Sequence, residues 1–215
     1  MKQLTSYNRV AGYLNKLFDL LNGHYFENAL TRPTITIQST PRAYGHFSTR
    51  DDTWVSVTGN SNEINIGAGT LARPIENVCA TLLHEMCHYH CHVNGIKDTS
   101  RGNTYHNKRF KEIAESHGLI VEHDEKYGWT MTTPSDDLLD FILENELTDI
   151  LITRNEFYGV AVVGTGAHSS TGASAPPRTS SSRKYICPCC GNSFRATKCV
   201  HIACMDCREE MVLAG

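Results

Sequence analysis

Apolar residues recur every three to four positions in three parts of the chain, as they do along the buried face of an amphipathic helix. The ranges with this period are residues 4–26, 74–94 and 136–150. Pro74 suits the first turn of the second range, because its missing N–H would have no partner there, and the Ser135 hydroxyl can cap the third range. We therefore predict helices over these ranges.

Between the first two helices, short runs alternate apolar and polar residues, which is typical of half-buried strands. Four strands are predicted, over residues 34–38, 42–48, 53–58 and 63–66. Residues 59–62, Gly-Asn-Ser-Asn, are a turn signal between the last two. Further extended pieces are predicted at 120–121 and 128–132. Because helices and strands are segregated along the chain, we predict an α+β fold with a small antiparallel sheet packed on helices.

The composition changes after Val163. Residues 164–183 consist almost entirely of Gly, Ser, Thr, Ala and Pro, with almost no bulky apolar side chain. Such a segment cannot bury enough surface to fold, and it is typical of a flexible tether. We therefore predict a first domain over residues 1–163, a linker over 164–183 and a small C-terminal module over 184–215.

The helix predicted over residues 74–94 contains a His-Glu-x-x-His motif at residues 84–88. Positions i and i+4 share one helix face, so the imidazoles of His84 and His88 can both reach a single metal ion. Glu85 then lies beside the ion, where it can take a proton from a water that the metal has made acidic. The motif predicts a zinc-dependent hydrolase with Glu85 as the general base.

A catalytic zinc ion of this kind needs a third protein ligand. His92 lies on the same stripe, but eight residues at roughly 1.5 Å each put its backbone about 12 Å from that of His84, which is too far. His106 is the best candidate, because it lies in the first turn of another amphipathic stretch, over residues 102–118, and can fold back over the helix predicted at 74–94. Cys91 is the alternative, since thiolate binds zinc well, although buried cysteine is commonly a small apolar side chain.

Six of the nine cysteines lie between residues 187 and 207. They include two Cys-x-x-Cys pairs, Cys187 with Cys190 and Cys204 with Cys207. Thirteen residues separate the pairs, which is the pattern of a tetrahedral Cys₄ zinc ribbon. A module of about thirty residues has too small a core to fold alone, so the ion supplies its stability. Cys189 and Cys199 are interpreted as surface thiols, with Cys189 as an alternative ligand in place of Cys187 or Cys190.

Composition narrows the classes of protein to consider. The 215 residues are 40% hydrophobic, enough for one ordinary core with a small module attached. No segment has the roughly 18 apolar residues that a membrane helix needs, and the start lacks a basic stretch followed by an apolar one. We therefore predict a cytoplasmic protein without a membrane partner.

Charge is distributed unevenly along the chain. The formal net charge is −3, but from residue 178 onward six Lys and Arg face three Asp and Glu, so this part is near +3 and the remainder near −6. A basic module fits contact with phosphates, although such a run can also be an ordinary solvated face. The candidate contacts are Arg178, Arg183, Lys184, Arg195 and Lys198.

Several segments together resemble the SprT-like (Spartan-type) zinc metalloprotease family. In the first domain they are residues 82–88, Asp98, residues 102–106, Phe110 and residues 114–119. The tail, with Tyr185-x-Cys187-Pro188-x-Cys190-Gly191 and Cys204-x-Asp206-Cys207, is similar to the zinc ribbon that some members carry. The likeness covers nearly all of residues 10–130. Cys87, Cys91, Cys189 and Cys199 are additional thiols to which it assigns no role.

The resemblance implies a set of site residues and a function. His84, His88 and His106 fall on the family's zinc-ligand positions and Glu85 on its general base. One catalytic and one structural zinc ion are thus expected. The family cleaves proteins bound or crosslinked to DNA, so the expected activity is peptide hydrolysis of DNA-associated protein substrates, with DNA as a partner and, in a bacterium, location at the nucleoid.

Two other functions stay open at this point. One is a non-catalytic DNA-binding or scaffolding zinc protein, and the other is a small-molecule amidohydrolase. For a protease, the substrate backbone is expected to add along an exposed strand, at residues 53–58 or 63–66.

Overall fold

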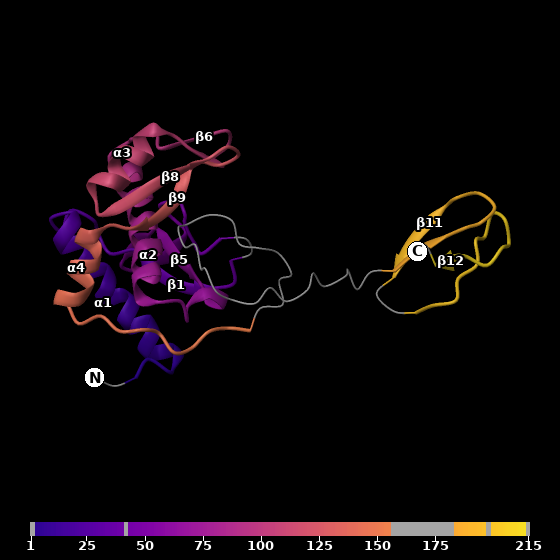
Figure 1. Cartoon of the computed structure of the whole chain (residues 1–215), viewed down its shortest axis with the longest axis horizontal. Helices are drawn as coiled ribbons and strands as arrows, with labels where there is room; N and C mark the ends of the chain where they lie inside the picture. Colours follow the sequence, from indigo (N-terminus) through magenta and orange to yellow (C-terminus); the bar gives the residue numbers. More distant parts are fainter. Residues whose placement is uncertain (1–2, 41–42, 156–182, 197–198, 214–215) are drawn as a thin grey trace. The chain divides into compact units, whose positions relative to one another are not determined.

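The computed structural model describes residues 3–40, 43–155, 183–196 and 199–213 (Figure 1). The chain divides into two compact units, Met1–Ser169 and Ser170–Gly215, and each is described by itself. The predicted linker lies outside the described residues, apart from Arg183, which begins a strand of the second unit.

The first unit has the predicted α+β fold. Its helices are α1 (Tyr7–Tyr25), α2 (Ile75–Val93), α3 (Lys108–Ser116) and α4 (Asp136–Glu144), with a short 3-10 helix η1 (Ala68–Thr70). Its strands are β1 (Thr34–Gln38), β2 (Gly45–Phe47), β3 (Trp54–Ser56), β4 (Gly59–Ser61), β5 (Glu63–Gly67), β6 (Thr99–Ser100), β7 (Tyr105–His106), β8 (Leu119–Asp124) and β9 (Gly128–Pro134). The helices predicted over residues 4–26 and 74–94 are confirmed.

The helix predicted over residues 136–150 is shorter than expected. The Ser135 hydroxyl accepts a hydrogen bond from the Leu138 amide, so the predicted cap is confirmed. The helix ends at Glu144, however, because Glu146 adopts a left-handed conformation with φ of 50°. Ile150 lies beyond this end and pairs with Leu4 as an isolated bridge.

The first sheet is mixed, whereas an antiparallel sheet was predicted. Its order is β1-β5-β2, with β5 parallel to β1 and antiparallel to β2. The chain passes from β1 through β2 before β5 returns between them, and this crossover makes one pair parallel. All five residues of β5 are buried, so the strand predicted at residues 63–66 exists but lies inside the sheet.

The turn predicted at residues 59–62 is wrong. Residues 59–61 form β4, which pairs with β3 in a separate two-stranded sheet, and the turn falls at Val57 and Thr58. The Ser56 hydroxyl accepts a hydrogen bond from the Thr58 amide in this turn. Gly59 has φ of 133°, a conformation that a residue with a side chain rarely adopts, so the glycine opens a strand here.

Helix α2 lies at the centre of the first unit. In Figure 1, α1 and α4 lie on one side of it, β1 and β5 on the other, and β8 and β9 above it. Most of its residues are buried, and Val78, Leu82, Leu83 and Met86 belong to the core. The second sheet, in the order β6-β7-β9-β8, packs against this helix through β9.

The second unit contains one small antiparallel sheet. Its strands are β10 (Arg183–Ile186), β11 (Ser193–Ala196) and β12 (Val212–Leu213), in the order β11-β10-β12. Tyr185 on the central strand is buried, and its hydroxyl accepts a hydrogen bond from the Val200 amide. Within the described part of the chain, no helix is long and apolar enough to cross a membrane.

Candidate active site and metal centres

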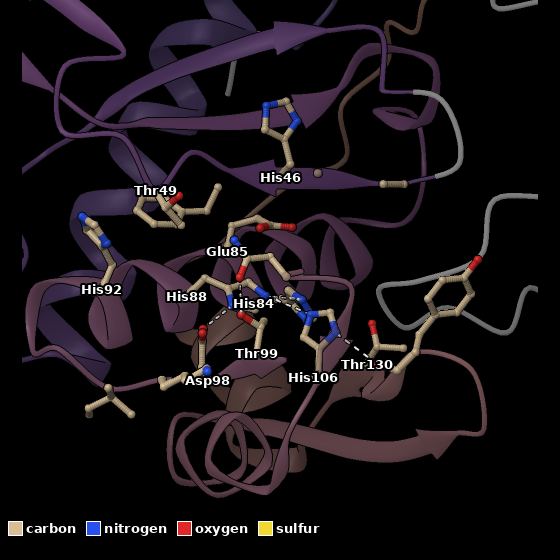
Figure 2. Close-up of a pocket in the computed structure, with 17 residues that line it drawn as sticks. His46, Thr49, His84, Glu85, His88, His92, Asp98, Thr99, His106 and Thr130 are labelled. Atoms are coloured by element: carbon tan, nitrogen blue, oxygen red, sulfur yellow. Dashed lines mark hydrogen bonds and ion pairs between the residues drawn. The ribbon is translucent and has the colours of Figure 1, made fainter. Parts of the chain in front are cut away.

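Three imidazole rings from two separate segments meet in the first unit. His84 and His88 come from α2 and His106 from β7, and Figure 2 shows the rings turned toward one another. The Nε2 atom of His88 lies 3.2 Å from that of His84 and 3.0 Å from that of His106. The three nitrogens predicted to bind one ion therefore converge on one point.

The position of His106 depends on a glycine in the neighbouring strand. His106 was expected in the first turn of a helix, but it lies in β7, and α3 begins two residues later with Asn107 as its N-cap. Gly128 of β9 pairs with His106 and has φ of 77°. A Cβ atom at Gly128 would lie 2.2 Å from the His106 carbonyl oxygen, so any larger residue would push β7 away.

The opposite nitrogen of each ring has a partner of its own. The Nδ1 contacts are His84 to the Thr132 hydroxyl at 3.1 Å, His88 to the Asp98 carboxylate at 2.5 Å and His106 to the Tyr127 carbonyl at 3.4 Å. A carbonyl or carboxylate can only accept, so a ring that contacts one carries its proton on Nδ1. The lone pair of Nε2 then faces the other rings, as in protein metal sites.

The electrostatics of the three rings favour a bound cation. Burial, followed by the neighbouring histidines, lowers the pKa of His84 well below its ordinary value and that of His106 to about 3. His84 and His106 are therefore neutral at physiological pH, which is the state that binds metal. Three Nε2 atoms this close, each on a ring whose Nδ1 atom has its own partner, fit a zinc ion with an open fourth position.

Glu85 lies between these rings and strand β2, which carries His46 (Figure 2). Complete burial raises the pKa of Glu85 to about 7, while His88 and a hydrogen bond from the Phe47 amide act in the opposite direction. A cation at the three imidazoles would favour the carboxylate further. Burial acts against the cation by raising this pKa, which makes Glu85 a stronger proton acceptor than an exposed carboxylate beside the same ion.

Gly45 makes the space that Glu85 occupies. A Cβ atom at Gly45 would lie 2.9 Å from the Asn65 carbonyl oxygen and 3.1 Å from Glu85 Oε1. Asn65 lies in β5, the central strand of the sheet, and its carbonyl oxygen cannot move aside as a side chain could. Strand β2 itself would therefore have to shift. Phe47, whose amide contacts Glu85, would shift with it.

We therefore expect Gly45→Ala to slow the peptide cleavage predicted from the sequence by about 10- to 100-fold without loss of zinc, because a displacement of this size would misalign Glu85, the predicted general base. Cleavage rate and zinc content should be measured on the same samples. Gly12→Ala is the matched control, since nothing lies within 4 Å of the added atom in α1. Wild-type cleavage by the Gly45 variant would show that β2 does not align Glu85.

A cleft of about 430 Å³ opens over these groups. Glu85, His88 and His106 line it together with Gly45 and Phe47 of β2. The cleft thus joins the convergent nitrogens, the buried carboxylate and the edge of the first sheet in one space.

The alternative ligands weighed from the sequence lie outside the three-histidine group. Cys91 is fully buried and hydrogen-bonds to the Asp98 carboxylate. His92 contacts Asp51, with Nε2 2.7 Å from the carboxylate oxygen, and lies apart from the three rings in Figure 2. The sequence did not indicate the role of Thr132. Its one visible signal was a threonine at an inward-facing position of a strand.

Comparison with protein families identifies the first unit. A model of the SprT-like family matches residues 14–131, more than half of the chain, and the match includes all three histidines and Glu85. The chain belongs to the SprT-like family. This assignment confirms the resemblance found in the sequence and supports a zinc protease in general terms. No curated protein and no solved structure matches the chain.

Outside the matched SprT-like residues, the second unit brings four sulfurs together. Cys187, Cys190, Cys204 and Cys207 have ligand atoms within 4.8 Å of one another. The surplus thiols Cys189 and Cys199 are exposed and lie outside this group. The arrangement is consistent with the zinc ribbon predicted from the cysteine spacing.

Two turns of the same design hold the four sulfurs. In the first turn, the Gly191 amide donates to the Cys187 carbonyl at 3.0 Å, and the Cys187 amide donates to the Asn192 carbonyl at 2.8 Å. In the second turn, the Arg208 amide donates to the Cys204 carbonyl at 2.7 Å, and the Cys204 amide donates to the Glu209 carbonyl at 2.8 Å. Gly191 and Arg208 occupy equivalent places, and both have positive φ, 73° and 56°. Each turn therefore points two sulfurs toward the same point.

The sulfurs of the second unit also fit a cation. Hydrogen bonds from the Cys190 amide and then the Cys189 amide outweigh the effect of burial and lower the pKa of Cys187 to about 7. Contact with Cys189 and then Cys190 raises the pKa of Cys207. Four crowded sulfurs cannot all ionise while they face only one another, and a zinc ion removes this repulsion.

Proposed function

We propose that this protein is a zinc-dependent endopeptidase that cleaves proteins bound or crosslinked to DNA. His84, His88 and His106 would hold the catalytic ion, Glu85 would act as general base, and the four clustered cysteines would hold a structural ion. One observation carries the proposal: a fully buried carboxylate lies beside three convergent imidazoles, at the edge of a sheet.

The substrate peptide would add to β2 rather than to the strands expected from the sequence. β5 lies between β1 and β2, and β3 pairs with β4, so β2 is the edge that lines the cleft. Tyr44 and Ser48 bond inward to β5, through Gly67 N to Tyr44 O and Ser48 N to Glu63 O. Because alternate residues of an antiparallel strand bond to opposite sides, the backbone groups of Gly45 and Phe47 point away from β5. The Phe47 amide already donates to Glu85, so the peptide would bond to the Phe47 carbonyl and to the backbone of Gly45.

The chemistry would be divided between the ion and Glu85. When bound, zinc supplies a Lewis acid that polarises the peptide carbonyl and makes water more acidic. Glu85 would take the proton from the attacking water and return it to the nitrogen of the leaving amine. Burial of Glu85 keeps bulk water from competing for that proton, and the Phe47 amide holds its carboxylate next to the docked peptide.

The second unit would contact DNA. Its part of the chain is near +3 while the remainder is near −6, so phosphate would be attracted to the ribbon end. Lys184 and Arg195 are backbone neighbours across β10 and β11. The candidates Arg178 and Lys198 lie outside the described residues. Phe194 is half exposed and offers a surface on which a base could stack.

DNA is expected to speed cleavage of a protein substrate crosslinked to it, and to have little effect on a short free peptide, because it concentrates enzyme and substrate on one molecule. The stimulation should fall steeply between about 50 and 200 mM salt, as phosphate contacts weaken. Rates are measured for both substrates at each salt concentration, with Lys184→Glu as a variant that should lose the stimulation. Equal cleavage with and without DNA at every salt concentration would remove DNA from the proposal and leave the protease.

A further inference from the structure

The loop between α2 and β6 contacts both segments that supply the three histidines, α2 with His88 and the segment that follows His106. Asp98 in this loop lies with Oδ2 2.5 Å from His88 Nδ1, and each of the two side chains is 14% exposed. A carboxylate only accepts, so the proton between them belongs to Nδ1. The contact fixes both the orientation of the His88 ring and the nitrogen that is left free.

The main chain of the same loop holds the segment that carries His106. The Asp98 carbonyl accepts a hydrogen bond from the Asn107 amide at 2.9 Å, and the Lys97 carbonyl accepts one from Asn107 Nδ2 at 2.7 Å. Thr99 pairs with His106 across β6 and β7. The residue next to His106 is thus tied to Asp98 through the backbone.

We infer that Asp98 is a positioning residue that sets two of the three histidines at once, His88 through its side chain and His106 through its backbone carbonyl. The inference rests on the proposed function, because it assigns Asp98 to the zinc site proposed there. Asp98 would not touch the ion or the substrate. It would bring together a helix and a strand that approach from different parts of the fold.

Cys91 supports the position of the Asp98 carboxylate. It is fully buried one turn after His88, and its carbonyl accepts the Ile96 amide at 2.8 Å, which turns the chain back toward the helix. Its thiol hydrogen-bonds to the Asp98 carboxylate, and the Thr99 hydroxyl, which donates its hydrogen to Asn103 Oδ1, lies beside the same carboxylate. The carboxylate is thereby held on several sides, and Cys91 supports Asp98 instead of replacing a histidine.

The test compares Asp98→Ala with Asp51→Ala in the full chain. Asp51 forms the same kind of pair with His92 of α2, with the nitrogen and oxygen 2.7 Å apart, but His92 is outside the three-histidine group. Zinc loading is followed by the ring signals of the three histidines in nuclear magnetic resonance spectra, at buffered zinc concentrations. We expect about 10- to 100-fold weaker loading for Asp98→Ala and wild-type loading for Asp51→Ala.

The metal-free spectra separate positioning from general damage. In the wild type, His88 should carry its proton on Nδ1, and the Asn107 amide should exchange slowly. In Asp98→Ala the proton of His88 should redistribute, while the rings of His84 and His106 stay unchanged. If Asp98→Ala does not fold, the wild-type spectra still decide: a proton on Nε2 of His88, or an Asn107 amide that exchanges like an exposed one, overturns the inference.

The outcomes also separate this inference from the proposed function. If the wild type loads no zinc at the three histidines, the proposed function fails and the inference fails with it. If the wild type loads zinc and Asp98→Ala loads it equally well, only the role of Asp98 is wrong.

Discussion

Replacement of Glu85 by glutamine is expected to lower the rate of peptide cleavage by about 10²- to 10⁴-fold, which is the usual contribution of a positioned general base. Glutamine has nearly the same shape and can fill the same buried space beside Gly45. It cannot take a proton from water. Zinc content should therefore stay at the wild-type value while cleavage is lost, and both are measured on one preparation.

Glu76→Gln is the matched control, because Glu76 lies in the first turn of the same helix and does not line the cleft. It should cleave like the wild type. Equal cleavage by Glu85→Gln and the wild type would contradict the assignment of Glu85. An absence of cleavage by the wild type, with and without DNA, would favour the non-catalytic scaffold, although a structural zinc site has no need of a buried carboxylate.

Replacement of Cys204 by serine is expected to unfold the second unit and to reduce zinc from two ions per chain to one. Structural zinc in small domains contributes about 10–16 kcal/mol of apparent binding free energy, and a unit with few buried apolar residues cannot replace it. The first unit has its own core and should keep its stability. Metal analysis and limited proteolysis would report both results.

Cys199→Ser provides the comparison, since Cys199 is exposed in the same unit and lies outside the four-sulfur group. It should retain two ions and resist proteolysis like the wild type. Should Cys204→Ser keep both ions, Cys189 would be the first residue to test as a substitute, because it contacts Cys207. A wild-type protein with a single ion would exclude one of the two proposed sites.

The helices could be predicted because their apolar period is long and regular, whereas strand details depended on contacts that no local pattern contains. Residues 59–62 have turn composition, yet β4 forms there because β3 supplies a partner. The parallel pairing of β1 with β5 follows from the order in which three strands fill one sheet. Alternation along a strand says which face is buried, not which neighbour it has.

The site could be predicted as far as side-chain spacing reaches. His84, Glu85 and His88 follow from helix geometry, and His106 from its place at the start of the next amphipathic stretch. The partners of the Nδ1 atoms could not be predicted. Thr132, for example, lies 48 residues from His84 in sequence and contacts it only in the folded protein. Asp98 entered only as part of a family likeness, without a role.

Strand β2 has a further consequence. It is three residues long, and it would hold a peptide by main-chain groups that every amino acid possesses. An enzyme built in this way selects its targets by whether a stretch of chain is extended and accessible, and hardly by its sequence. Such permissiveness is safe in a cell only if encounters are restricted, so the DNA contact proposed for the second unit would limit where cutting takes place.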